Sequence, residues 1–126
     1  MAHQGAPLPV LDDSQKISVG ELKDLLAKSD PLVVDVRNPS EIEASGSIGS
    51  KKNINIPITD LDKELSLSND EFKAKYGLDK PQGDGSDVIF HCMKGGRGSR
   101  AVVVAEKHGM KKARNLEGGY GLWSSQ

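Results

Sequence analysis

The chain has 126 residues, of which 36% are hydrophobic and 28% charged, and a formal net charge of −1. This length suits one domain with its own core, and we expect no membrane-spanning segment because no apolar run is long enough. The near-neutral charge predicts neither a nucleic-acid partner nor an anionic membrane partner. One cysteine, Cys92, excludes an intramolecular disulfide and is compatible with a reducing compartment, so we expect a cytoplasmic protein.

The chain begins with a stretch that carries no regular apolar pattern. Residues 1–15 contain two prolines and several small residues, so we expect a flexible N-terminal lead followed by a single domain over 16–126. The pair Ser18 and Glu21 has the spacing of a capping box and predicts the start of a helix. The helix then carries an apolar stripe of Leu22, Leu25 and Leu26.

A strand, a helix and a second strand are expected next. Leu32–Val36 is a short apolar run that predicts a buried parallel strand. Asn38 has the features of an N-cap, with proline in the first turn after it and Glu41 three residues on, so a short helix is expected there. Ile54–Ile56 predicts the second strand, and Thr59 is expected to cap another short helix.

A second capping box predicts the next helix. Ser68 and Glu71 have the required spacing, and Gly77 is expected to end the helix. Phe72 and Tyr76 lie four residues apart, so their rings should stack on one face of that helix. These two aromatic residues are interpreted as part of the core.

The last part of the chain predicts two more strands with a helix between them. Lys80–Asp87 holds proline and glycines and is expected to be a loop. Val88–His91 is interpreted as the central strand, Ser99–His108 as a helix, and Ala113–Leu116 as the final strand. Such alternation is typical of an α/β domain with a parallel sheet, in which ligands bind beyond the carboxyl ends of the strands. The site is therefore expected where the central strand leads into Cys92.

Cys92 is followed by a glycine-rich basic loop that runs into a helix. Glycines allow the backbone to curl and turn its N–H groups inward, and the start of a helix adds partial positive charge. Both effects, together with nearby cations, favour the thiolate of cysteine, which is the nucleophilic form. The three glycines and three cations of this segment are Gly95, Gly96, Gly98, Lys94, Arg97 and Arg100.

Cys92 has three other interpretations. A cysteine that ends an apolar strand is often a small packing residue, but packing does not require the glycines and cations that follow. A phosphatase loop has the pattern Cys-x5-Arg, whereas Arg97 follows Cys92 with four residues between them, which suits a single sulfur better than a phosphoryl group. A metal site is not expected, because His3, His91 and His108 show no ligand spacing with the cysteine.

Four further residues have both a functional and a structural interpretation. His91 should point to the opposite face of the sheet from Cys92, because neighbouring residues on a strand alternate. Asp35 and Arg37 share a face at a strand end and are expected to pair with loop groups and support the scaffold. Trp123 is interpreted as a packing anchor.

Several short motifs, in the same order along the chain, make the sequence resemble the rhodanese-like sulfurtransferases. The active loop of that family has the pattern Cys-x-x-Gly-x-Arg, which Cys92, Gly95 and Arg97 match. The segment 61–81 is most similar to the small single-domain type associated with thiosulfate and glutathione. One departure is Gly46-Ser47-Ile48, where the family commonly has Gly-His-Ile. The other matching segments are Val34-Asp35-Val36-Arg37, Asn55-Ile56-Pro57, Leu116-Glu117-Gly118-Gly119-Tyr120 and Trp123.

The resemblance implies a fold and a reaction. The fold is a rhodanese-like α/β domain with a central parallel sheet of about five strands and helices on both faces. Cys92 would be the catalytic nucleophile that carries sulfur as a persulfide between a small-molecule donor, such as thiosulfate, and a thiol or cyanide acceptor, with no cofactor. Arg97 is expected to donate to the loop's own carbonyls or to the incoming anion, and Lys94 to the substrate. The expected substrate-binding residues are Met93, Lys94, Gly95, Gly96, Arg97 and Gly98.

The sequence leaves the partner and the function partly open. A sulfur-relay protein could be a partner in addition to the small-molecule donor and acceptor. The alternative function is a non-catalytic rhodanese-like module that carries persulfide or binds a protein.

Overall fold

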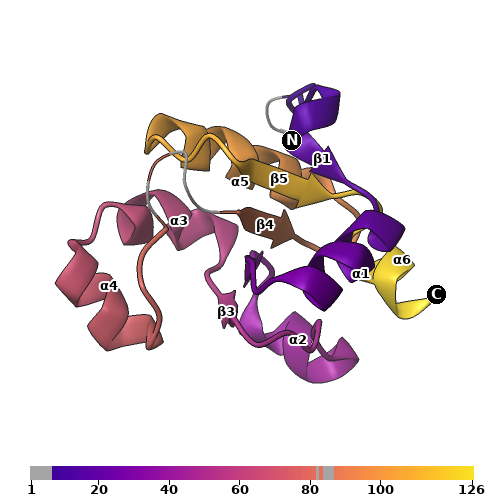
Figure 1. Cartoon of the computed structure of the whole chain (residues 1–126), viewed down its shortest axis with the longest axis horizontal. Coiled ribbons are helices and arrows are strands. Elements are labelled where there is room, and N and C mark those ends of the chain that lie inside the picture. Colours follow the sequence, from indigo (N-terminus) through magenta and orange to yellow (C-terminus); the bar gives the residue numbers. More distant parts are fainter. Residues whose placement is uncertain (1–6, 82, 84–86) are drawn as a thin grey trace, which may run out of the picture.

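Short strands and helices alternate along the chain in the computed structural model, which describes residues 7–81, 83 and 87–126 (Figure 1). The strands are β1 (Lys16–Ile17), β2 (Leu32–Asp35), β3 (Asn53–Asn55), β4 (Val88–His91) and β5 (Ala113–Leu116). The helices are α1 (Val19–Lys28), α2 (Pro39–Ser45), α3 (Ile58–Leu65), α4 (Asn69–Tyr76), α5 (Gly96–Lys107) and α6 (Gly119–Ser124), and the 3-10 turn η1 (Asp13–Gln15) precedes them.

The five strands form one parallel sheet in the order β1-β5-β4-β2-β3. β4 lies in the middle, with His91 in register with Asp35 of β2 and Phe90 in register with Asn115 of β5. The carboxyl ends of these three strands therefore meet where Cys92 leaves the sheet. The predicted central parallel sheet of about five strands with helices on both faces is confirmed.

The two faces of the sheet bury two separate apolar clusters. Val34 and Phe90 belong to the cluster covered by α3, α4 and α5, whereas Val33 and Ile89 belong to the cluster covered by α1 and α6 (Figure 1). This alternation follows from the two-residue period of a strand. Trp123 of α6 packs against the second cluster, as predicted for an anchor.

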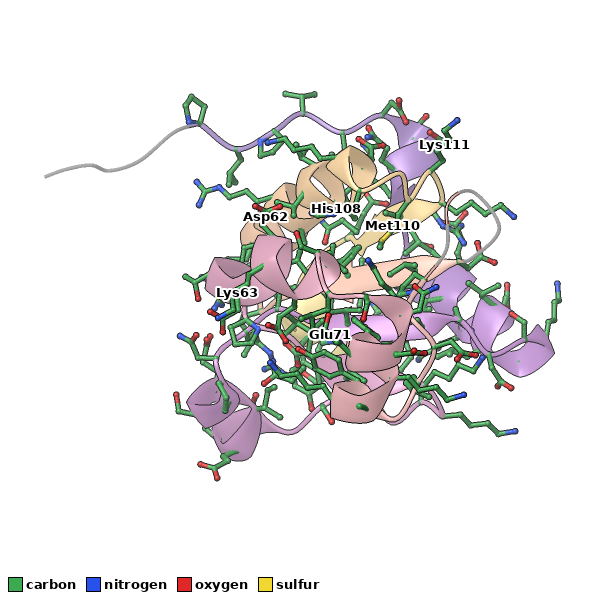
Figure 2. All side chains as sticks on the ribbon, turned by 90° about the vertical axis from the view of Figure 1, so that its left-hand side faces the viewer. Asp62, Lys63, Glu71, His108, Met110 and Lys111 are labelled. Atoms are coloured by element: carbon green, nitrogen blue, oxygen red, sulfur yellow. The ribbon has the colours of Figure 1, made fainter. Side chains whose placement is uncertain are left out.

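Figure 2 looks onto the face covered by α3, α4 and α5. Asp62 of α3 and His108 at the end of α5 approach each other there, with 2.8 Å between the carboxylate and the ring nitrogen. Among the residues that the structure describes, no helix has the length and apolar character needed to cross a bilayer.

Local sequence signals account for the starts of two helices. Ser18 accepts the backbone N–H of Glu21 at the start of α1, and Ser68 accepts that of Glu71 at the start of α4, each at 3.1 Å. The rings of Phe72 and Tyr76 lie 4.7 Å apart, as the four-residue spacing predicts. Gly77 ends α4 with a φ of +74°, a value that favours glycine. The capping boxes are therefore confirmed, whereas the two rings contact each other at a tilt of 44° and do not stack face to face.

Several predicted boundaries were wrong. β2 ends at residue 35 instead of 36, and β3 begins one residue earlier than predicted. Thr59 is not a cap, because α3 begins at Ile58 after Pro57, whose ring presets the backbone for a helix start. α5 begins at Gly96 instead of Ser99, because the loop amides already turn into the helix.

The sequence did not predict β1 or α6. β1 has two residues and depends on its pairing with β5, and α6 has six residues, two of them glycines. Residues 7–15 belong to the expected lead, and they include η1. The boundary between a lead over 1–15 and a domain over 16–126 stays a prediction, and residues 1–6 lie outside the described residues.

Candidate active site

Cys92 lies at the bottom of a hollow between the end of β4 and the start of α5. The hollow has a volume of about 440 Å³, and the cysteine itself is only 2% exposed. The surrounding side chains include charged groups of both signs and two apolar groups. The lining residues are Leu8, Glu41, Cys92, Met93, Lys94, Gly96, Arg97 and Arg100.

Backbone N–H groups of the loop point at the sulfur of Cys92. The N–H of Gly95 donates to Sγ at 3.0 Å, and the N–H of Gly98 donates at 3.5 Å. Gly95 has a φ of +123°, which a residue with a side chain rarely adopts. Donor groups in this position can stabilise negative charge that develops on sulfur during a reaction.

The carbonyls of the loop point the other way, toward α6. The N–H of Tyr120 donates to the carbonyl of Cys92 at 2.7 Å, and that of Gly121 donates to the carbonyl of Met93 at 2.9 Å. A Cβ atom at Gly119 would lie 2.5 Å from the Cys92 carbonyl oxygen, so only glycine lets α6 approach this closely. α6 therefore holds the loop with its carbonyls outward and its amides inward.

Asn115 of β5 supports the loop from the side of the sheet. Its side-chain amide donates to the carbonyl of Gly95 and to Oγ of Ser99, both at 3.0 Å. A Cβ atom at Gly98 would lie 2.0 Å from Oδ1 of Asn115. The glycine at position 98 is thus required by the asparagine that braces the loop.

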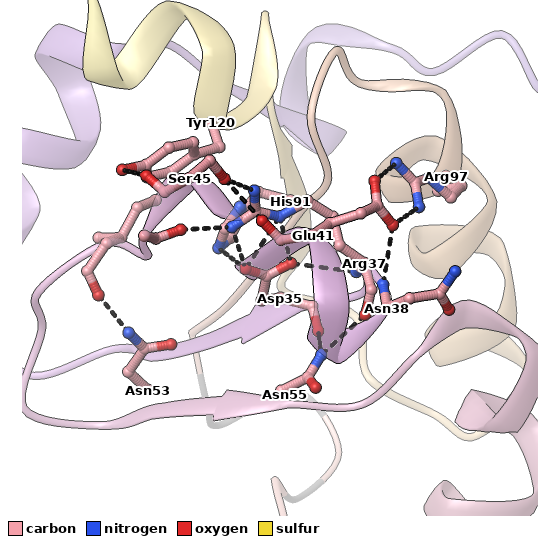
Figure 3. Close-up of polar contacts among 12 residues, drawn as sticks. Asp35, Arg37, Asn38, Glu41, Ser45, Asn53, Asn55, His91, Arg97 and Tyr120 are labelled. Carbon is pink, nitrogen blue, oxygen red and sulfur yellow. Dashed lines mark hydrogen bonds and ion pairs between the residues drawn. The ribbon is translucent and has the colours of Figure 1, made fainter. Parts of the chain in front are cut away.

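Arg97 has a partner that the sequence did not predict. Nη1 and Nη2 of its guanidinium donate to the two carboxylate oxygens of Glu41, at 2.7 and 2.9 Å (Figure 3). α2 presents Glu41 at the hollow, and a planar carboxylate matches the guanidinium fork. The expected donation of Arg97 to an incoming anion stays a prediction.

Glu41 therefore connects α2 to α5. The Arg97 guanidinium and, to a smaller extent, the backbone N–H of Asn38 hold the pKa of Glu41 at about 2, so the carboxylate is charged at neutral pH. The same pair raises the pKa of Arg97. Both side chains are about one-third exposed, at 32% for Glu41 and 31% for Arg97, so water reaches this ion pair.

Asp35 and Arg37 form a buried ion pair behind the loop. Nη2 of Arg37 lies 2.7 Å from Oδ2 of Asp35, and the guanidinium also donates to Oγ of Ser45 and to the carbonyl of Gly46 (Figure 3). The ring of Tyr120 covers the guanidinium at 4.6 Å. The pairing with loop groups follows the prediction, and it ties α2 and α6 to the end of β2.

His91 lies on the same face of the sheet as this ion pair. Its Nε2 is 3.8 Å from Oδ2 of Asp35, and its side chain is fully buried. Within the described part of the chain, neither ring nitrogen has a hydrogen-bond partner. Burial lowers the pKa of His91, although the charge of Asp35 opposes the shift. Cys92 belongs to the apolar cluster on the other face, so the predicted separation of imidazole and sulfur is confirmed.

The structure brings most of the predicted site residues to the hollow, but their roles stay predictions. Met93 and Gly96 line it, and the exposed side chain of Lys94 lies at its mouth. Among residues 7–81, 83 and 87–126, no group of three or more His, Cys, Asp or Glu side chains is placed to hold a metal ion.

Sequence reasoning missed four contributors to this site: Leu8, Glu41, Asn115 and Tyr120. Glu41 was interpreted only as a helix-capping residue, because no residue near it in the sequence indicates its second role as the partner of Arg97. Asn115 did leave a signal, since it is a polar residue in the middle of a short strand that is otherwise largely buried. Leu8 and Tyr120 reach the site through tertiary packing alone.

The fold and the loop geometry define a class of domain, and the chain belongs to the rhodanese-like domain family, whose model matches residues 18–126. The chain is 34% identical over 107 residues to the human thiosulfate:glutathione sulfurtransferase, which covers 85% of this chain and 90% of the relative. A yeast (Saccharomyces cerevisiae) protein of the same name is 32% identical over 113 residues, or 88% of this chain and 78% of the relative. The solved structure of the human single-domain sulfurtransferase TSTD1 matches with a TM-score of 0.80 and 33% identity, over 89% of this chain and 96% of that one.

Proposed function

We propose that the protein is a sulfurtransferase that moves a sulfane sulfur from thiosulfate to glutathione through a persulfide on Cys92. The observation that carries this proposal is the pair of N–H groups, from Gly95 and Gly98, that converge on a cysteine sulfur inside an open hollow. The relatives named as thiosulfate:glutathione sulfurtransferases support the choice of donor and acceptor.

The first half of the reaction loads the enzyme. The thiolate of Cys92 attacks the outer sulfur of thiosulfate, a new S–S bond forms, and the S–S bond of thiosulfate breaks as sulfite leaves with the electron pair. The negative charge then lies on the outer sulfur of the persulfide. The inward amides of the loop, including those of Gly95 and Gly98, are placed to stabilise that charge.

The second half of the reaction empties the enzyme. The thiolate of glutathione attacks the outer sulfur of the persulfide, and Cys92 leaves as a thiolate, which regenerates the starting state. Since the chain has no second cysteine, the sulfur must pass to an external acceptor. Two half-reactions with a covalent intermediate predict ping-pong kinetics.

The charged side chains around the hollow favour the binding of anionic substrates. Lys94, Arg97 and Arg100 contribute three positive charges around the hollow and Glu41 one negative charge. Lys94 is the side chain that we propose to meet the donor, because it is exposed and belongs to the loop itself. The cytosol remains our proposed compartment, because the reaction needs a reduced cysteine.

Steady-state kinetics test the proposal. Sulfite release from thiosulfate in the presence of glutathione should follow parallel double-reciprocal lines, and Cys92→Ser should release none. A chain that releases no sulfite would instead be the non-catalytic carrier or binding module, and activity that persists in Cys92→Ser would exclude the persulfide mechanism. Turnover of an aryl phosphate by the wild type, abolished in Cys92→Ser, would favour the phosphatase alternative.

A further inference from the structure

A segment outside the matched domain reaches the active site. The family model begins at residue 18, yet Leu8 lines the hollow that holds Cys92. A Cβ atom added at Gly96 would lie 3.4 Å from both terminal methyl carbons of Leu8, so this side chain packs across the first residue of α5. Leu8 is 53% exposed, so about half of this residue remains accessible beside the hollow.

The residues that follow Leu8 attach this N-terminal segment to the domain. Leu11 packs against the apolar cluster that α5 also covers. Asp12 and Gln15 cap η1, and Nε2 of Gln15 donates to Glu106 of α5 at 2.8 Å. Figure 2 shows the N-terminal part of the chain running past α5. These contacts anchor the segment that follows Leu8 to α5, whereas Val10 on the same segment is 97% exposed.

Leu8 gives the hollow an apolar edge beside a cationic one. The charged side chains at the mouth belong to α2, the loop and α5, whereas Leu8 and Met93 are the apolar lining residues. A molecule that enters the hollow therefore meets both apolar and charged side chains. An acceptor that fits both edges needs an anionic group to meet the cations and an aliphatic portion to lie against Leu8.

We propose that Leu8 is a specificity-determining residue for the sulfur acceptor. It favours thiols in which an aliphatic stretch separates the sulfur from a carboxylate. The inference rests on the proposed sulfur transfer and concerns its second half only, so loading of Cys92 by thiosulfate does not depend on it. Complete burial of one methylene group increases binding about fourfold, so partial burial against a half-exposed leucine should give about twofold per methylene.

Acceptor chain length tests the proposal in single turnovers. Protein is loaded with thiosulfate and desalted, and then the rate of sulfur removal by mercaptoacetate, 3-mercaptopropionate and 6-mercaptohexanoate is followed by intact mass. The ratio of the wild-type rate to the Leu8→Ala rate is compared for each thiol, because the intrinsic reactivity of the thiol cancels in that ratio. We expect a ratio near one for mercaptoacetate that rises with each added methylene, up to about sixteenfold for 6-mercaptohexanoate, which has four more of them.

Matched controls separate this role from a structural one. Val10→Ala should leave all three rates unchanged, and Leu8→Met should keep at least half of the wild-type rate for 6-mercaptohexanoate. In the wild type, 6-mercaptohexanol should react several-fold more slowly than 6-mercaptohexanoate, and added salt should reduce that difference.

Two results would overturn the proposal in different ways. If loading succeeds but the ratio is the same for all three thiols, sulfur transfer stands and Leu8 does not select the acceptor. A wild-type protein that takes up no sulfur from thiosulfate would refute the proposed function, and the selectivity proposal would fall with it.

Discussion

Replacing Gly98 by alanine should destabilise the protein, although the same change in a helix usually does the opposite. An ordinary helical Gly→Ala change stabilises by about 0.5–1 kcal/mol, because alanine has the better helix propensity. At Gly98 the added methyl group would lie 2.0 Å from Oδ1 and 3.0 Å from Cγ of Asn115, far inside the ordinary contact distance. The side chain of Asn115 must therefore move.

The cost follows from what Asn115 contacts. It is 5% exposed, and its amide holds the carbonyl of Gly95 and the hydroxyl of Ser99. Overpacking costs about 1–3 kcal/mol, and a buried polar group left without its partner costs about 1–3 kcal/mol. After subtraction of the helix gain, Gly98→Ala should lower the free energy of unfolding by about 1–5 kcal/mol.

A double-mutant cycle measured by urea denaturation checks this cause. In an Asn115→Ala background the methyl group has room, so adding Gly98→Ala should stabilise that variant by about 0.5 kcal/mol. The reasoning is refuted if Gly98→Ala is neutral or stabilising in the wild type. It is also refuted if the cost is the same with and without Asn115, because the clash would then lie elsewhere.

Two further predictions concern the supports of the loop, and a third concerns buried His91. Arg97→Lys should lower kcat/KM for sulfite release about three- to tenfold, because an ammonium cannot hold both oxygens of Glu41, and unchanged kinetics would show that this pair is irrelevant. Gly119→Ala should lower the free energy of unfolding, measured by urea denaturation, by about 2–4 kcal/mol, because its methyl group would meet the Cys92 carbonyl at a backbone φ of +60°. The control Gly20→Ala, which has open space on α1, should not be destabilising. Burial lowers the pKa of His91, so below about pH 6.5 the unfolded chain binds a proton that the folded chain does not. The free energy of unfolding therefore decreases as the pH is lowered. Between pH 7.5 and 5.5 this loss is at most about 1.4 kcal/mol, and urea titrations should show a smaller loss in His91→Leu; an equal loss in both proteins would assign the pH dependence to other groups.

The sequence predicts well the features that depend on neighbouring residues. The capped start at Ser18 and the contact between the rings of Phe72 and Tyr76 need only neighbours within one helix, and both are present. The strand that delivers Cys92 is equally visible, because an apolar run followed by glycines has few other interpretations. These local signals suffice to place the nucleophile beyond the central strand.

Contacts between distant segments could not be predicted in the same way. Nothing near Arg97 indicates that Glu41, 56 residues earlier, would receive its guanidinium. α6 is stabilised by its hydrogen bonds to the carbonyls of Cys92 and Met93, so its short glycine-rich sequence carries little signal. The sequence therefore predicted the chemistry of the loop better than the residues that hold it.

The most direct test of the persulfide on Cys92 is the intact mass of the purified protein after incubation with thiosulfate under non-reducing conditions. We expect a gain of one sulfur atom, about 32 Da, located on the peptide that contains Cys92 and removed by glutathione. Cys92→Ser should show no gain. An unchanged mass in the wild type, or the same gain in Cys92→Ser, would contradict the proposed sulfur transfer.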